Sequence, residues 1–150
     1  MRIYMKKGIT LIALCVLIST TLIGCFPENK TIYDGPLQVE FNPVTATLRT
    51  AQATQYEMKI QLIGPHQDVP INVRFEIDTA NSTSQLGTHF DFESMNVTIP
   101  ANSSFGYIKV NAIPQNVTGI TTLRVVLLGD DTGKVKAAEN YKTFTLTIRP

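Results

Sequence analysis

The sequence has few of the residues on which many functional sites depend. It contains no tryptophan, two histidines and two cysteines in 150 residues. It also contains no Gly-x-Ser-x-Gly elbow and no glycine-rich phosphate loop. A zinc site needs three or four ligands, and His66 and His89 without a free cysteine are too few. We therefore expect a protein that is not an enzyme and that has no metal centre.

The N-terminus has the order of charge and hydrophobicity that is typical of a secretory signal. Three basic residues and no acid precede an almost wholly apolar run at 9–23, which is shorter than the about 20 residues that a membrane-spanning helix needs. The run ends in Leu-Ile-Gly-Cys, which resembles the bacterial lipobox. The resemblance implies cleavage between Gly24 and Cys25, followed by acylation of Cys25. The alternative is a cysteine that lies by chance near the end of an ordinary signal.

Lipidation would decide where the protein lies. A single acyl chain binds membranes only marginally, whereas the three chains that a lipobox cysteine normally receives give a nearly permanent anchor. This covalent lipid is the one prosthetic group we expect. Phe26 follows the cysteine, in place of the aspartate that is associated with inner-membrane retention. We therefore expect attachment to the bacterial outer membrane, with the periplasmic and surface leaflets both open.

The rest of the chain has the length of one domain. Removal of residues 1–24 leaves 126 residues. The segment 25–35 begins with the lipidated cysteine and continues with proline, glycine and asparagine without periodicity, which indicates a tether. The domain then spans 36–150. Cys15 leaves with the signal, so no disulfide is expected. The remaining chain has ten basic and twelve acidic residues, which argues against the clustered basic face of a nucleic-acid-binding protein.

Apolar residues alternate with polar ones along most of the domain. This period of two is typical of strands with one buried and one solvated face. Leu123 to Leu128 is apolar on both faces except for Arg124, as in a central strand that is covered on both sides. About seven or eight strands with turn signals between them indicate an all-β, antiparallel sandwich; the expected strands are 37–41, 44–48, 56–62, 71–77, 97–99, 108–112, 123–128 and 144–148.

One passage resembles a known family. Residues 87–92 read Gly-Thr-His-Phe-Asp-Phe, residues 97–104 read Val-Thr-Ile-Pro-Ala-Asn-Ser-Ser, and a strand around Ile108 and Val110 follows. This order resembles the Calx-beta domain, an immunoglobulin-like sandwich, most closely over 87–110 and more loosely over 56–150. A Calx-beta-like domain behind a lipobox is similar to small Bacteroidetes outer-membrane lipoproteins. Such lipoproteins often accompany SusC/SusD-type glycan-uptake systems, and the resemblance implies that context here.

The sequence departs from the Calx-beta pattern at two positions that matter. Calcium-binding members carry acids in the turn that corresponds to 114–120, and this turn has no carboxylate. Calcium takes six to eight oxygen ligands, so the calcium role is not carried over. The family's glycine after Ile-Pro is replaced by Asn102, which tolerates the left-handed conformation that we expect there.

Two pairs of acids are candidate cation ligands. Asp130 and Asp131 lie between two glycines, and they either bind a cation or form a turn in which a carboxylate accepts hydrogen bonds from backbone amides. Asp91 and Glu93 flank Phe92, and they could join the first pair if their loops meet. The alternative is that Asp91 closes a turn while Phe90 or Phe92 fills the end of the sandwich. Two carboxylates are too few for a cation, which favours the turns.

Two further residues are candidates for carbohydrate chemistry. Tyr107 points away from Ile108 and Val110, so its ring is either a contact for a glycan or part of the packing between strands. Asp78-Thr79-Ala80 fits the acceptor pattern of Bacteroidetes O-glycosylation, which makes Thr79 a candidate acceptor.

Three functions remain in competition. The first is a non-catalytic interaction or spacer module, tethered to the membrane and accessory to an outer-membrane protein complex for glycan uptake. The second is a glycan-binding surface lipoprotein. The third is a structural or adhesive component that assembles through a sheet edge, for which the threonine-rich last strand is the candidate.

Overall fold

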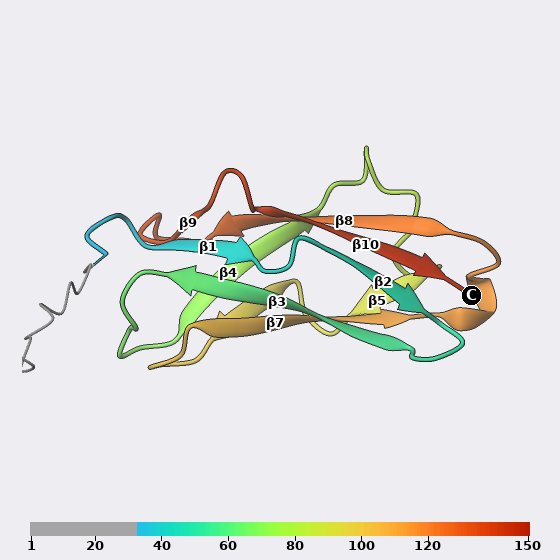
Figure 1. The fold of residues 1–150 in the computed structure, drawn as a ribbon, viewed down its shortest axis with the longest axis horizontal. Helices are drawn as coiled ribbons and strands as arrows, with labels where there is room; N and C mark the ends of the chain where they lie inside the picture. The colour runs from blue at the N-terminus through green and yellow to red at the C-terminus, as the bar shows by residue number, and fades with distance from the viewer. Residues whose placement is uncertain (1–32) are drawn as a thin grey trace, which may run out of the picture. The chain divides into compact units, whose positions relative to one another are not determined.

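The structure is a computed structural model that describes residues 33–150, and the predictions for Gly24 and Cys25 lie outside these residues. Residues 33–150 form ten strands and one short 3₁₀ helix (Figure 1). The elements in chain order are β1 (Gln38–Phe41), β2 (Thr45–Arg49), β3 (Gln55–Ile63), β4 (Ile71–Ile77), β5 (Phe90–Phe92), β6 (Asn96–Ile99), β7 (Phe105–Ala112), η1 (Pro114–Asn116), β8 (Thr121–Gly129), β9 (Lys136–Ala137) and β10 (Thr143–Arg149). Within 33–150 no helix has the length and hydrophobicity to cross a bilayer.

The strands form two five-stranded sheets. The first sheet has the order β5-β7-β3-β1-β9, and the second has the order β2-β10-β8-β4-β6. The all-β sandwich predicted from the sequence is therefore confirmed. Its fully antiparallel arrangement is not, because β9 pairs with β1 and β10 pairs with β2 in parallel.

All eight expected strands are present, and the expected number was too low. The two further strands are β5, with three residues, and β9, with two. Strands this short are too brief to show an alternating pattern, and they are defined by their pairing with β7 and β1. The first sheet consequently ends in a short strand at each edge.

The chain crosses between the sheets near Pro43. Strand β1 belongs to the first sheet, while β2 begins four residues after the end of β1 and belongs to the second. Pro43 has no backbone N–H to donate to a ladder, so a strand is easily interrupted there. The amide of Thr145 donates to the carbonyl of Val44 at 2.8 Å, which fixes the chain beside β10 as soon as it enters the second sheet.

The inward side chains of both sheets form a single apolar core. Aromatic rings join the layers: Phe144 of β10 lies 5.2 Å from Phe41 of β1, centroid to centroid, and Phe92 of β5 lies 5.1 Å from Phe75 of β4. Removing these apolar surfaces from water is the main stabilising contribution. The largest fully buried side chains are Phe41, Phe90, Phe144, Met58, Ile60, Ile99, Leu123, Leu127, Leu146, Ile148, Val39 and Val73.

Two expectations for individual strands were wrong. Strand β8 is central in its sheet, but only one of its faces is covered, since Leu128 on the other face is 42% exposed. Strand β10 is not an edge, because it pairs with β8 on one side and with β2 on the other. The edges of the second sheet are β2 and β6.

Candidate functional site

The turn after β8 contains the first pair of candidate acids. Gly129 ends β8 with φ +87°, and a Cβ at this position would collide with the carbonyl oxygen of Val135. The glycine therefore allows the chain to fold back closely on itself. The carboxylate of Asp130 then accepts hydrogen bonds from the hydroxyl of Thr132 and, at 3.0 Å, from the amide of Val135.

These hydrogen bonds change the ionisation of Asp130. Slight burial acts to raise the pKa of Asp130, but the hydrogen bonds from Thr132 and from the amides of residues 133–135 favour the charged form more strongly and lower the pKa. Asp131 has a different partner, the Arg74 guanidinium of β4, at 2.6 Å. Both carboxylates thus have partners within the protein. Asp130 accepts from a backbone amide, as the turn interpretation expects, whereas Asp131 forms an ion pair with another strand.

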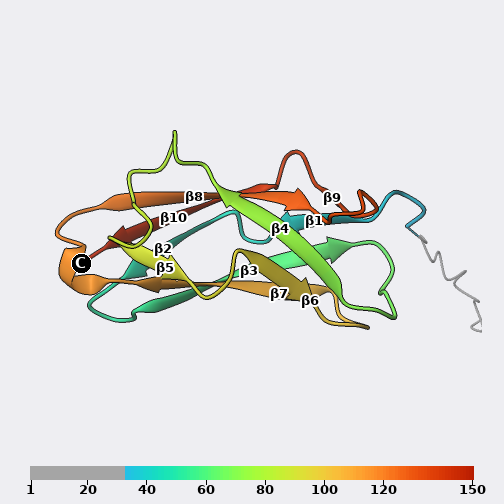
Figure 2. The same cartoon turned by 180° about the vertical axis from the view of Figure 1, so that it is seen from behind.

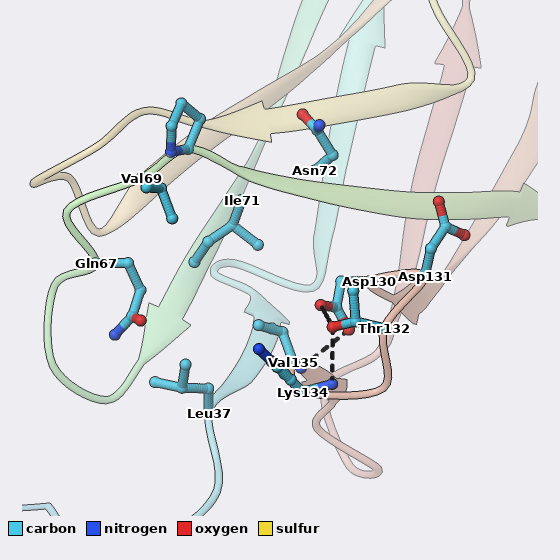
Figure 3. Close-up of a pocket in the computed structure, with 11 residues that line it drawn as sticks. Leu37, Gln67, Val69, Ile71, Asn72, Asp130, Asp131, Thr132, Lys134 and Val135 are labelled. Atoms are coloured by element: carbon cyan, nitrogen blue, oxygen red, sulfur yellow. Dashed lines mark hydrogen bonds between the residues drawn. The ribbon is translucent and has the colours of Figure 1, made fainter.

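A cleft lies between this turn and the loop that leads into β4. It has a volume of about 390 Å³, and Figure 3 shows its lining residues. The side chains of Leu37, Val69, Ile71 and Val135 supply its apolar surface, and polar groups surround them. Several of these polar groups already have partners within the protein: Gln67 donates to the carbonyl of Pro65 at 2.9 Å, and Asp130 and Asp131 have the partners described above. The other polar lining residues are Asn72, Thr132 and Lys134.

The second pair of acids lies in a different part of the domain. Asp91 belongs to β5, at the edge of the first sheet opposite to β9, and it faces Asn111 of β7. It therefore lies in a strand and does not close a turn. Glu93 is 3.8 Å from the ammonium of Lys109. Within residues 33–150 no three His, Cys, Asp or Glu residues come together in a way that could hold a metal ion.

The aromatic residues around Asp91 have a packing role. Phe90 is fully buried, and its ring centroid lies 5.3 Å from that of Phe92. Both rings therefore pack into the core from the edge strand β5. The motif Gly-Thr-His-Phe-Asp-Phe anchors a short strand to the core.

Tyr107 lies on the outer face of the first sheet, with its side chain 50% exposed. Phe105, two residues earlier on the same face, is 39% exposed, and the ammonium of Lys59 lies 5.0 Å from the centroid of its ring. Lys59 and Gln61 of β3 face Tyr107 and Phe105 across the strand pair. We call Phe105, Tyr107, Lys59 and Gln61 the Tyr107 face. Sequence reasoning missed Phe105, although its spacing of two from Tyr107 was the signal.

Thr79 is exposed in the turn after β4. Its neighbour Asp78 accepts hydrogen bonds from the side chain of Asn81, at 2.8 and 3.0 Å, and lies 3.5 Å from the Nε atom of Arg124. Thr79 thus lies in a turn in which Asn81 and Arg124 fix the position of the Asp78 carboxylate.

Both histidines hold loops together. The Nε2 atom of His66 and the hydroxyl of Ser104 are 2.7 Å apart, which links the loop after β3 to the loop before β7. The Nδ1 atom of His89 accepts a hydrogen bond from the amide of Gln85 at 3.0 Å.

In the loop before β7, Asn102 has φ 58°, so the expected left-handed conformation is confirmed.

Comparison with known proteins identifies the fold. No protein-family model matches the sequence, and no curated protein matches it. Among solved structures, CBD12 from CALX1.2 matches 75% of this chain with TM-score 0.60 and 18% identity. The chain has the Calx-beta-like fold. A Bacteroides ovatus protein of unknown function matches 76% of this chain with TM-score 0.58 and 10% identity. This chain spans about half the length of these two structures, at 43% and 52%.

Proposed function

We propose that this chain is a lipid-anchored, non-catalytic sandwich module of the bacterial outer membrane, accessory to a glycan-uptake complex. The observation that carries the proposal is the Calx-beta-like fold, which is similar both to CBD12 from CALX1.2 and to a Bacteroides ovatus protein. The lipobox-like Leu-Ile-Gly-Cys supplies the anchor. The candidate acids support a non-catalytic role, since Asp130 stabilises a turn and Asp131 forms an ion pair with Arg74.

Membrane fractionation tests the anchor. Wild-type protein is expected in the outer-membrane fraction, and Cys25→Ser is expected to leave that fraction. Cys15→Ser is the matched control, because this residue lies before the proposed cleavage site. If Cys25→Ser still fractionates with outer membranes after cleavage, the lipid anchor is wrong.

Affinity purification from outer membranes tests the accessory role. The tagged, lipidated protein is expected to retain a porin-type partner in mild detergent. A protein that is recovered alone from membranes in which a glycan-uptake complex is intact would contradict this part of the proposal.

Glycan binding on the Tyr107 face is a second candidate function. Two exposed aromatic rings on one strand offer stacking surfaces, and amide and charged groups beside them can bind hydroxyl groups. We expect Tyr107→Ala or Phe105→Ala to weaken binding to a neutral glycan panel about tenfold. Tyr141→Ala is the matched control, since Tyr141 is 53% exposed and lies outside this face. Equal loss in all three variants would contradict a site on the Tyr107 face.

Assembly through a sheet edge is the third candidate. The candidate edge next to the last strand is β2, because within residues 33–150 β2 pairs with β10 on one side and with no strand on the other. An added strand would bind the free backbone groups of β2. Concentration-dependent oligomers that disappear when Thr47 is replaced by proline would support this assembly, and a monomer at all concentrations would contradict it.

A further inference from the structure

The outer face of the second sheet carries an ordered array of threonine and arginine side chains. Strands β2 and β10 run in parallel and in register, so that Thr45 pairs with Thr145, Thr47 with Thr147 and Arg49 with Arg149. Their inward neighbours, such as Leu48 and Ile148, are buried, so all six side chains point outward. We call these six residues the Thr/Arg ladder.

The two arginines of the ladder have the same charge and adjacent positions. Neighbouring strands lie about 4.8 Å apart, and like charges at directly opposed positions destabilise a sheet. Two other arginines of this face have acidic partners: Arg74 lies 2.6 Å from Asp131, and Arg124 lies 3.5 Å from Asp78. Within residues 33–150 no carboxylate lies at ion-pair distance from Arg49 or Arg149.

Arg149 also has a hydrogen-bond donor without an acceptor. Its Nε atom is shielded from solvent, and, like the Nε atom of Arg124, it makes no hydrogen bond to any residue in the described part of the chain. A shielded donor without an acceptor costs free energy. An anion placed between the two guanidinium groups would accept from their terminal nitrogens, not from the shielded Nε atom, and it would remove their repulsion. Guanidinium groups bind carboxylate, sulfate and phosphate with paired hydrogen bonds.

The threonines beside the pair indicate what carries the anion. Thr45 and Thr47 are exposed, and Thr145 and Thr147 are half-buried, so four hydroxyls extend the surface along β2 and β10. Each hydroxyl can donate and accept a hydrogen bond, as sugar hydroxyls do. Strands β2 and β10 end near the C-terminus, at the opposite end of the sandwich from β9 (Figure 2).

We propose that the Thr/Arg ladder binds an acidic saccharide, with a uronate carboxylate or a sulfate ester between Arg49 and Arg149 and sugar hydroxyls on the threonines. This site differs from the Tyr107 face, which lies on the other sheet and has aromatic rings. It is also independent of the anchor, so a soluble protein could still bind and an anchored one could fail to bind.

Calorimetry on the full chain in detergent tests the site. The probes are tetragalacturonate, a sulfated heparin tetrasaccharide, methyl-esterified tetragalacturonate as the uncharged match, and sodium sulfate alone. We expect one of the two acidic tetrasaccharides to bind, at least tenfold more tightly than the ester, and its affinity to fall with added salt. Binding of neither acidic tetrasaccharide, or equal binding of acid and ester, would overturn the proposal.

Matched variants locate the binding. Replacing both Arg49 and Arg149 by glutamine is expected to weaken acidic-saccharide binding by about tenfold or more, and Arg74→Gln should change it less than twofold. The double variant should melt at the same or a higher temperature, since the like-charge contact is gone. Thr47→Val should weaken saccharide binding and leave sulfate binding unchanged. Sulfate binding as tight as the saccharide, or unchanged binding in the double variant, would contradict the assignment.

Discussion

The ionisation of Asp130 is tied to the conformation of one turn. Its pKa is lowered in the folded state because Thr132 and backbone amides donate to the charged carboxylate. A carboxyl group with a lowered folded pKa stabilises the fold above its unfolded pKa of about 3.9, and this contribution is lost as the pH falls through the folded value. We expect Asp130→Asn to lower the free energy of unfolding by about 1 kcal/mol at pH 7, and by less at pH 2.5. Urea titrations at both pH values measure the difference.

Asp131 provides the control for that experiment. Its ion pair with Arg74 is exposed, with 49% of the arginine and 76% of the aspartate side chain accessible. Surface pairs of this kind contribute about 0 to 1 kcal/mol. Asp131→Asn should therefore be close to neutral at both pH values. If it costs as much as Asp130→Asn, the hydrogen-bonded turn is not the reason for the effect.

Gly129 and Gly133 differ in the space around them, although both have positive φ, +87° and +73°. A Cβ on Gly129 would meet the carbonyl of Val135, whereas a Cβ on Gly133 would meet nothing within 4 Å. Left-handed backbone costs a non-glycine residue about 1–2 kcal/mol. We expect Gly133→Ala to lose about this much stability and Gly129→Ala to lose clearly more, as measured by denaturant midpoints. Equal losses would show that φ alone matters.

At the scale of single residues, the sequence identifies some site features and not others. The glycines around Asp130 and Asp131 predict a turn, because turn chemistry is local. The outward direction of Tyr107 follows from alternation with Ile108 and Val110. The Thr/Arg ladder could not be predicted, since Arg49 and Arg149 are 100 positions apart in the sequence and meet only through the register of β2 with β10.

At the scale of elements, the same distinction holds. Alternation over four or more residues predicts β3 and β10 because each strand carries its own pattern. It does not predict β5 and β9, which have three and two residues and depend on their partners. Nor does alternation give strand order, so the last strand was wrongly expected at an edge. Apolar residues on both faces of β8 predict cover on both sides, whereas Leu128 is exposed.

Strand β5 should contribute to stability out of proportion to its length. Phe90 is fully buried and contacts the ring of Phe92 in the core, while Phe105 on β7 is 39% exposed. Removing a buried phenylalanine side chain costs about 3–5 kcal/mol. We expect Phe90→Ala to lose that amount and Phe105→Ala to lose less than about 1 kcal/mol, as determined by chemical denaturation. A small loss at Phe90 would show that β5 is loosely attached.

At the scale of the whole molecule, residues 33–150 should fold by themselves. The buried core and both sheets are built from this segment, and it contains no cysteine. We expect a 33–150 fragment to unfold in one cooperative transition, with a free energy of about 6–18 kcal/mol at the usual 0.05–0.15 kcal/mol per residue. Its melting temperature should match that of the full chain in detergent and should not change with reducing agent. A fragment that melts several degrees lower would mean that residues before Tyr33 stabilise the sandwich, and the segment 25–35 would then be more than a tether.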